Sequence, residues 1–223
     1  MKGAFAIAAI AFALASSAFA QSPPVVAPMT FRVGGVELKF VLPEGYCLPI
    51  DKYIDIAQLT SAADDVNVTD LTLYHCDANG ITDASQLLIK TPKNLLLTDV
   101  GRREALDGLG AAFDKPEFAS ALASGSIDSE ASKSMAKVFG DNLTVKSQIT
   151  PLGKDDICAY LGGALSGSAN NESYTGAFAA CMTVVKTRFL VVYVYGPYAG
   201  AQSVIALVPK AKAVARMLID QNE

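Results

Sequence analysis

The chain has 223 residues, of which 51% are hydrophobic, and 18 basic and 22 acidic side chains give a formal net charge of −4 at pH 7. That much apolar material can bury a core, which excludes intrinsic disorder for most of the chain. No stretch is dense in lysine and arginine, which excludes a typical nucleic-acid binder and electrostatic binding to anionic lipid heads.

The first twenty residues, MKGAFAIAAIAFALASSAFA, have the pattern of a bacterial secretory signal peptide. One charge, Lys2, precedes a mainly apolar run, and Ala18-Phe19-Ala20 supplies the small residues that signal peptidase accepts. We expect cleavage after Ala20 and a periplasmic or secreted protein. The apolar run is shorter than the roughly 20 residues that span a bilayer, so no membrane span is expected in the mature chain.

The remaining chain is expected to hold one domain. The sequence QSPPVVAPMT, residues 21–30, predicts a flexible Pro-rich lead, and residues 31–223 predict a single folded unit. A hairpin is expected across Gly34-Gly35, because apolar residues alternate on both sides of that turn signal.

The next elements alternate between helix and strand. A helix is expected over residues 51–60 and a strand over 67–76, followed by a turn at Asp77-Ala78-Asn79-Gly80 and a strand over 86–91. Residues 99–139 are expected to be helical, because apolar residues recur at helical spacing and Pro116 can begin a new helix.

The C-terminal part returns to strands. We expect a strand over residues 143–149, and then a helix carrying Cys158 whose N-terminus is stabilised by Asp155-Asp156. Residues 177–185 and 189–195 are expected to be strands joined by a turn. Both faces of the second strand are apolar, so it should be central and covered on both sides. A final amphipathic helix contains Pro209, which predicts a kink or the start of its second half.

These elements predict an α+β fold, an antiparallel sheet with helices on both faces, in one disulfide-stapled domain. The closing unit, AFAACMTVVKTRFLVVYVYGPYAGAQSVIALVPKAKAVARMLI, resembles the end of the PsbP-like α/β/α sandwich and covers about a quarter of the chain. The resemblance implies a family of binding and assembly helpers more than enzymes. It carries no functional residue over, because no signature motif is matched.

The four cysteines are Cys47, Cys76, Cys158 and Cys181. An even count in an exported protein predicts disulfides, and pairing in sequence order, Cys47–Cys76 and Cys158–Cys181, closes the shortest loops. The only histidine, His75, precedes Cys76 on a strand, where neighbouring side chains point to opposite faces. This disfavours a Cys/His catalytic pair.

Catalytic and metal motifs are weak or missing in the sequence. A zinc site would need clustered ligands, but the sequence has one histidine and no C-x-x-C pair. The segment Asp77–Asp83 has oxygen ligands for calcium at alternate positions, but it lacks the downstream glutamate that a calcium-binding loop needs in register. Nucleophile-elbow and phosphate-loop motifs are not found. We expect no cofactor and no metal. An enzyme stays open as the alternative, a secreted hydrolase whose carboxylates come from distant segments.

The function expected from the sequence is therefore a non-catalytic binding or envelope-accessory protein, with an unknown protein or small ligand as partner. Tyr195 and Tyr198, near the end of the two-faced strand, are the first candidates for ligand binding, since tyrosine combines an apolar body with a polar tip. Arg102 and Arg103 open a helix and could hold an anion, although such a run is more often a solvated face.

Overall fold

A computed structural model describes residues 28–140, 143–169 and 172–223. Seven strands form one antiparallel sheet in the order β3-β4-β5-β9-β8-β7-β6, and two more form a separate hairpin, β1-β2. The strands are β1 Met29–Val33, β2 Val36–Phe40, β3 Tyr46–Cys47, β4 Asn67–Asp77, β5 Gly80–Pro92, β6 Thr144–Lys154, β7 Ala159–Ala169, β8 Glu172–Val185 and β9 Arg188–Pro197.

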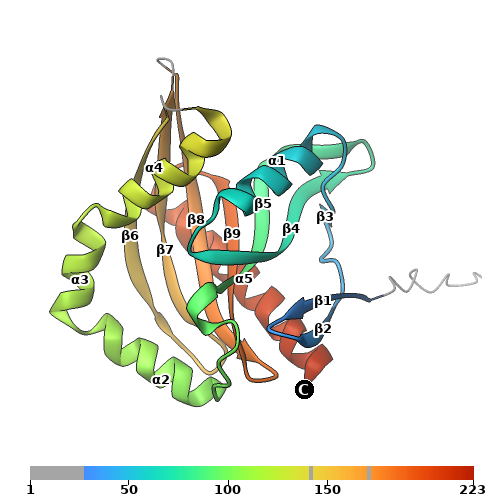
Figure 1. Cartoon of the computed structure of the whole chain (residues 1–223), viewed down its shortest axis with the longest axis vertical. Helices are drawn as coiled ribbons and strands as arrows, with labels where there is room; N and C mark the ends of the chain where they lie inside the picture. The colour runs from blue at the N-terminus through green and yellow to red at the C-terminus, as the bar shows by residue number, and fades with distance from the viewer. Residues whose placement is uncertain (1–27, 141–142, 170–171) are drawn as a thin grey trace, which may run out of the picture.

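Helices cover both faces of the large sheet (Figure 1). Helix α5 packs against β7, β8 and β9 on one face, and α1, α2 and α4 lie on the other side. The helices are α1 Lys52–Ala63, α2 Arg102–Phe113, α3 Pro116–Ala123, α4 Ser126–Phe139 and α5 Ala201–Asn222, with a short 3-10 helix at Lys93–Leu95. The predicted α+β class, with an antiparallel sheet between helices, is confirmed.

Strand β9 lies at the centre of the sheet and has two apolar faces, as its sequence predicts. Leu190, Val192 and Val194 belong to the core beneath α5, whereas Phe189 and Val191 belong to the core beneath α2. Each face of one strand therefore contributes to a different hydrophobic cluster, which fixes the register of β9 between β5 and β8.

The helix expected around Cys158 is wrong, because residues 159–169 form strand β7. Asp155 does accept the N–H groups of Ile157 and Cys158, at 2.8 and 2.9 Å, in the way that a helix cap would. Those N–H groups instead belong to the tight turn that joins β6 to β7, where Lys154 pairs with Ala159. Further along the same two strands, Gly163 pairs with Ile149 and permits a close approach of β7 to β6, since a Cβ at Gly163 would lie 1.7 Å from the Gln148 carbonyl oxygen.

The β1-β2 hairpin, predicted at Gly34-Gly35, is confirmed and docks beside α5 (Figure 1). The side chain of Asn222 makes this junction: its Oδ1 accepts the Lys39 N–H at 2.8 Å and its Nδ2 donates to the Lys39 carbonyl at 2.8 Å. An amide side chain at the end of α5 therefore pairs with β2 as the backbone of a neighbouring strand would.

The predicted signal peptide, residues 1–20, lies outside the described residues, as does most of the lead, residues 21–30. The cleavage site and the domain boundaries stay predictions. None of the described helices combines the length and the apolar character needed to cross a lipid bilayer. Pro209 lies within α5, which continues on both sides of it as one helix, so it does not begin a separate helix.

Candidate functional site

An open hollow of about 440 Å³ lies between α1 and β4. Three segments line it. Leu48 and Pro49 come from the connection between β3 and α1, one side of α1 contributes Ala57, Gln58, Ser61 and Ala62, and β4 contributes the four consecutive residues Thr69–Thr72. The volume is within the range of small-molecule sites, and most of the wall is apolar.

A β-bulge places Asp70 at this hollow. Thr69 pairs with Lys90 of β5 and Leu71 pairs with Ile89, so Asp70 is an extra residue that has no partner across the sheet. Bulges redirect side chains in this way, and they are common near functional sites. Aspartate is also disfavoured in regular strands, which is consistent with its position at the irregularity.

The Asp70 carboxylate is only partly satisfied. Its Oδ2 accepts a 2.7 Å hydrogen bond from the hydroxyl of Thr91, which is fully buried. Its Oδ1 and the hydroxyl oxygen of Thr69 are buried and have no hydrogen-bond partner among the described residues. Two unpaired acceptors at one hollow are unusual, since the great majority of buried polar atoms are paired.

Burial raises the pKa of Asp70 to about 6, and the hydrogen bond from Thr91 opposes that rise only in part. Above this pH the side chain is ionised, so at neutral pH the hollow contains a negative charge. Lys90, which lies opposite Thr69 across the strand pair, is already engaged, because its ammonium lies 2.7 Å from Asp64. Burial opposes ionisation of Asp64, but the hydrogen bond and charge of Lys90 lower its pKa.

The lining residues favour binding over catalysis. A carboxyl with a raised pKa can act as a general acid or base, but the lining contains no histidine, cysteine or second acid to work with it. The described residues also contain no cluster of three or more histidine, cysteine or acidic side chains that could hold a metal ion. The hollow thus combines mainly apolar walls with two lining residues, Thr69 and Asp70, that each have one buried and unpaired oxygen.

The tyrosines predicted to bind a ligand lie in different environments. Tyr195 packs beneath the helices, with its ring centroid 6.1 Å from those of Phe178 and Tyr193. Burial raises the pKa of Tyr193 to about 12 and that of Tyr195 further. Tyr198 lies beyond the end of β9 and is 39% exposed. Ligand binding by Tyr195 and Tyr198 therefore stays a prediction.

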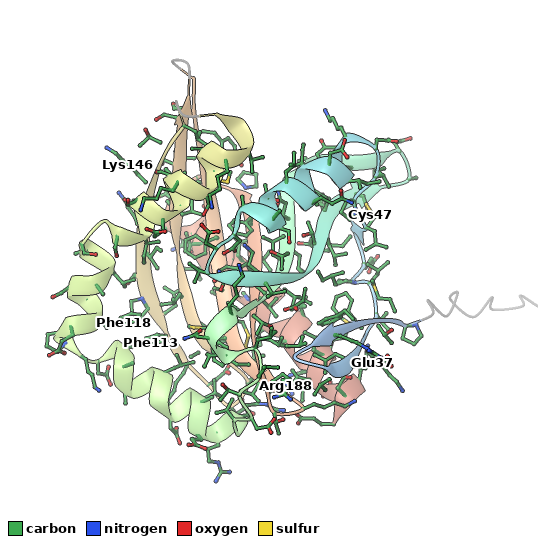
Figure 2. The ribbon with its side chains drawn as sticks, in the orientation of Figure 1. Glu37, Cys47, Phe113, Phe118, Lys146 and Arg188 are labelled. Carbon is green, nitrogen blue, oxygen red and sulfur yellow. A yellow bond between two sulfur atoms is a disulfide. The ribbon has the colours of Figure 1, made fainter. Side chains whose placement is uncertain are left out.

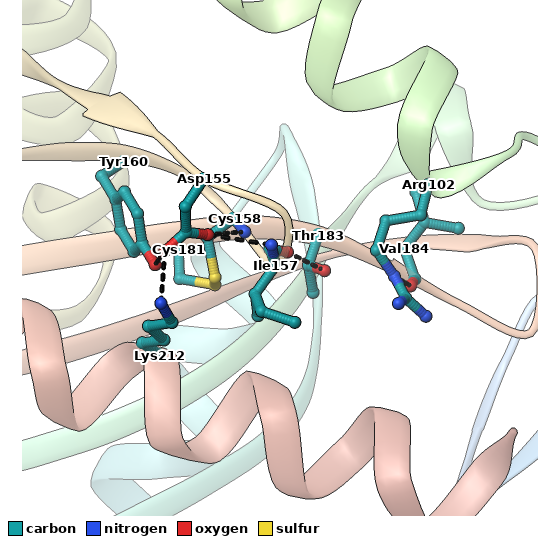
Figure 3. Close-up of a disulfide and its surroundings, with 9 residues drawn as sticks. All are labelled: Arg102, Asp155, Ile157, Cys158, Tyr160, Cys181, Thr183, Val184 and Lys212. Carbon is teal, nitrogen blue, oxygen red and sulfur yellow. Dashed lines mark hydrogen bonds and ion pairs between the residues drawn. A yellow bond between two sulfur atoms is a disulfide. The ribbon is translucent and has the colours of Figure 1, made fainter.

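The two arginines at the start of α2 also lie in different environments. The Arg102 Nε donates to the Val184 carbonyl at 2.9 Å, and its guanidinium pairs with Glu223. Figure 3 shows Arg102 beside Val184, below the start of its helix. Arg103 is exposed and lies near Asp107, whose pKa is lowered first by Lys154 and to a smaller extent by Arg103. Arg102 is thus a structural link between α2, β8 and the end of α5.

The two cysteine pairs are in different states. Cys158 and Cys181 form a disulfide and are both fully buried (Figure 3). Cys47 and Cys76 are half-buried free thiols, and the Cys47 thiol lies 3.8 Å from the Tyr74 carbonyl oxygen. One of the two predicted bridges is therefore present, and the other stays a prediction.

His75 and Cys76 face different partners, as alternation along a strand predicts. The His75 Nδ1 lies 2.7 Å from the Thr82 hydroxyl and 3.5 Å from an Asp83 carboxylate oxygen. The Cys76 thiol contacts Cys47 instead. The adjacent acids of the turn are used locally, because Asp77 accepts the Asn79 N–H at 2.7 Å.

A second open hollow, of about 380 Å³, lies between the start of α1 and the β4–β5 turn. Ile50, Asp51, Lys52 and Tyr53 form one wall, and Asn79, Gly80 and Ile81 form the other. It contains no buried unpaired side-chain atom among the described residues, so it lacks the feature that distinguishes the first hollow.

Comparisons with known proteins give a likeness to solved structures only. No protein-family model matches the sequence, and no curated protein matches it. Among solved structures, the chain is similar to the solution structure of cyanobacterial PsbP (CyanoP) from Synechocystis sp. PCC 6803, with 11% identity and a TM-score of 0.39. The match covers 87% of this chain and 96% of that one. It agrees with the PsbP-like resemblance of the C-terminal quarter, and nothing about ligands or partners follows from it.

Proposed function

We propose that this is an exported binding protein that holds a small organic cation, with an apolar body, in the hollow between α1 and β4. Export is inferred from the N-terminal sequence pattern, and binding is inferred from the hollow. The expected ligand is a primary or secondary ammonium attached to a hydrocarbon group.

One observation carries the proposal: the buried Asp70 Oδ1 without a partner. An ionised carboxylate oxygen removed from water costs free energy unless a donor meets it. The Asp70 and Thr69 side chains would rotate toward an ammonium seated in the hollow, which would then donate to this oxygen and to the Thr69 hydroxyl, the second unpaired acceptor. Its hydrocarbon part would lie against Leu48, Pro49 and Ala57.

The hydrolase alternative has less support. Glycosidase-type chemistry uses two carboxyl groups that face each other across a bond, one of them with a raised pKa. Among the described residues, Asp70 is the only carboxyl whose pKa is raised, whereas those of Asp64 and Asp155 are lowered. Asp64 and Asp155 are also paired with Lys90 and Lys212.

The test is a titration of the purified protein with hexylamine at pH 7.5, followed by two-dimensional NMR. We expect shift changes confined to residues 48–49, 57–62 and 69–72. Asp70→Asn should weaken binding about tenfold or more, because the charge that attracts the ammonium is lost. Thr69→Val, which removes only a neutral acceptor, should weaken it by a smaller factor.

Two controls separate recognition from general charge and hydrophobicity. Asp220→Asn removes the same charge at an exposed position on α5 and should leave the affinity unchanged. 1-Hexanol has the same length but no charge and should bind much more weakly than hexylamine. Equal affinities of Asp70→Asn and the unmodified protein for hexylamine would refute the proposal.

A further inference from the structure

The hollow lies entirely within the stretch of chain between the two free thiols. Cys47 is the residue before Leu48, and every lining residue falls between Cys47 and Cys76. This stretch includes the whole of α1 and most of β4. A bond between the two sulfurs would therefore close a loop that contains the complete wall of the hollow.

Few hydrogen bonds hold the segment of Leu48 and Pro49 to the rest of the sheet. Strand β3 is two residues long and pairs with β4 only at Tyr46–His75 and Cys47–Tyr74. One further bond, from the Cys76 N–H to the Gly45 carbonyl at 2.9 Å, continues the contact. So short a pairing opens easily, because few hydrogen bonds must break.

The thiols are placed to strengthen this attachment. Cys47 lies opposite Tyr74 in the register, and Cys76 follows two residues later, so the two cysteines are diagonal neighbours across the strand pair. Diagonal neighbours of this kind point to the same face of the strand pair, and the Cys47 thiol contacts the Tyr74 carbonyl at 3.8 Å. Figure 2 shows Cys47 on β3, at the side of the molecule that faces the β4–β5 turn.

We propose that Cys47 and Cys76 form a reversible disulfide that pins β3 to β4 and thereby sets the ligand affinity of the hollow. The inference rests on the proposed function, since it assigns a regulation to that site. In the oxidised protein Leu48 and Pro49 are held against β4 and the hollow is preorganised. In the reduced protein this wall opens more often, and binding must first order it.

The chemistry is thiol–disulfide exchange with a small-molecule or protein disulfide, for example oxidised glutathione. One cysteine thiolate attacks the glutathione disulfide, which forms a mixed disulfide and releases one glutathione. The second cysteine then attacks the protein sulfur of the mixed disulfide and releases the second glutathione. The protein loses two protons and two electrons, and the glutathione disulfide is reduced to two thiols.

The surroundings indicate the order of attack. Burial raises the pKa of the Cys47 thiol to about 11, and the hydrogen bond and charge of Cys76 act in the same direction. Cys47 therefore stays protonated at neutral pH while the pair is reduced, which makes it a poor first nucleophile.

The test equilibrates the full-length protein with mixtures of reduced and oxidised glutathione and measures three quantities. Intact mass after alkylation gives the fraction bridged. Amide hydrogen exchange reports the opening of residues 48–62 and 69–72. Hexylamine titration gives the affinity. Cys158–Cys181, fully buried, serves as an internal reference that should stay closed throughout.

We expect oxidation to remove the mass of two hydrogens, slow exchange in the lining residues about tenfold and tighten hexylamine binding by a similar factor. A Cys47→Ser, Cys76→Ser protein should fold, keep Cys158–Cys181 and show no response to the glutathione ratio. It separates the effect of the bridge from that of glutathione itself.

The outcomes distinguish the two proposals. Failure to bridge at any glutathione ratio, or bridging with unchanged exchange, overturns the inference. If the bridge forms and slows amide hydrogen exchange but hexylamine binds in neither state, the proposed function is overturned. The slower amide exchange would still support a disulfide that holds β3 to β4. Bridging and slower exchange with equal hexylamine affinities overturns the regulation.

Discussion

The turn between β6 and β7 and the hollow between α1 and β4 each contain a partly buried aspartate, but the hydrogen bonds and ion pairs of the two aspartates differ. At the turn, Asp155 accepts from Ile157 N, Cys158 N, Tyr160 Oη and Lys212 Nζ (Figure 3). At the hollow, Asp70 accepts one hydrogen bond, from Thr91.

The pKa values follow the contacts. Burial opposes ionisation of Asp155, but Lys212 and the donated hydrogen bonds lower its pKa to about 2, whereas burial raises the pKa of Asp70 to about 6. Asp155, whose carboxylate has four partners, holds the β6–β7 turn to α5. Asp70 has one oxygen that no described residue fills, which is why it is the candidate for ligand binding.

The largest expected effect comes from the disulfide beside Asp155. Replacing Cys158 and Cys181 by alanine should lower the free energy of unfolding by about 3 kcal/mol, because a buried bridge of sequence separation 23 is lost. Urea denaturation measures this. Cys47→Ala with Cys76→Ala, under reducing conditions, should change stability by less than about 1 kcal/mol. Similar losses in the two double variants would remove the contrast between the regions.

A smaller loss is expected from Asp155→Asn. The variant cannot pair with Lys212 as a charge and should be destabilised by about 1–2 kcal/mol at pH 7. Because the folded pKa lies below the unfolded value, the contribution of Asp155 is present above about pH 4 and is lost as the pH falls through about 2. When the variant is unfolded by acid, its stability should therefore lack the loss that protonation of Asp155 causes in the unmodified protein. The exposed neighbour, tested as Asp156→Asn, should behave like the unmodified protein.

The smallest effect, and one of opposite sign, is expected from Asp70→Asn. The folded pKa of Asp70 lies above the unfolded value, so its ionisation destabilises the fold progressively as the pH rises from about 4 to 6. The variant should therefore be more stable than the unmodified protein by roughly 1 kcal/mol at pH 8, discounted for partial exposure, and similar to it at pH 4. Urea denaturation across that range checks the sign, and a loss of stability at pH 8 would contradict it.

The regular parts of the fold were predictable from local pattern. The two apolar faces of β9 indicate a central strand, and Gly34-Gly35 indicates the first hairpin; both predictions are confirmed. The helix predicted around Cys158 was wrong for a physical reason. An aspartate such as Asp155 accepts the N–H groups that follow it both at the start of a helix and in a tight turn, so the sequence pattern is the same for the two structures. Only pairing with β6 and β8 decides between them.

The candidate site was harder to predict from the sequence than the fold. Whether the Asp70 carboxylate is satisfied depends on Thr91 of β5, which the fold brings beside the bulge in β4. The available signal was an aspartate in the middle of NVTDLTLYHC, where an acidic residue interrupts a strand and indicates a bulge. Tyr195 drew attention by its chemistry, but its ring fills core space.

The pairing of Asn222 with β2 also constrains how the molecule is assembled. The hairpin of residues 29–40 emerges early during synthesis, but the amide that closes its edge lies at residue 222. The first strands must therefore wait, with their apolar side uncovered, until nearly the whole chain has been made. Contacts of such long sequence separation slow folding, which leaves the unfolded chain available to chaperones for longer.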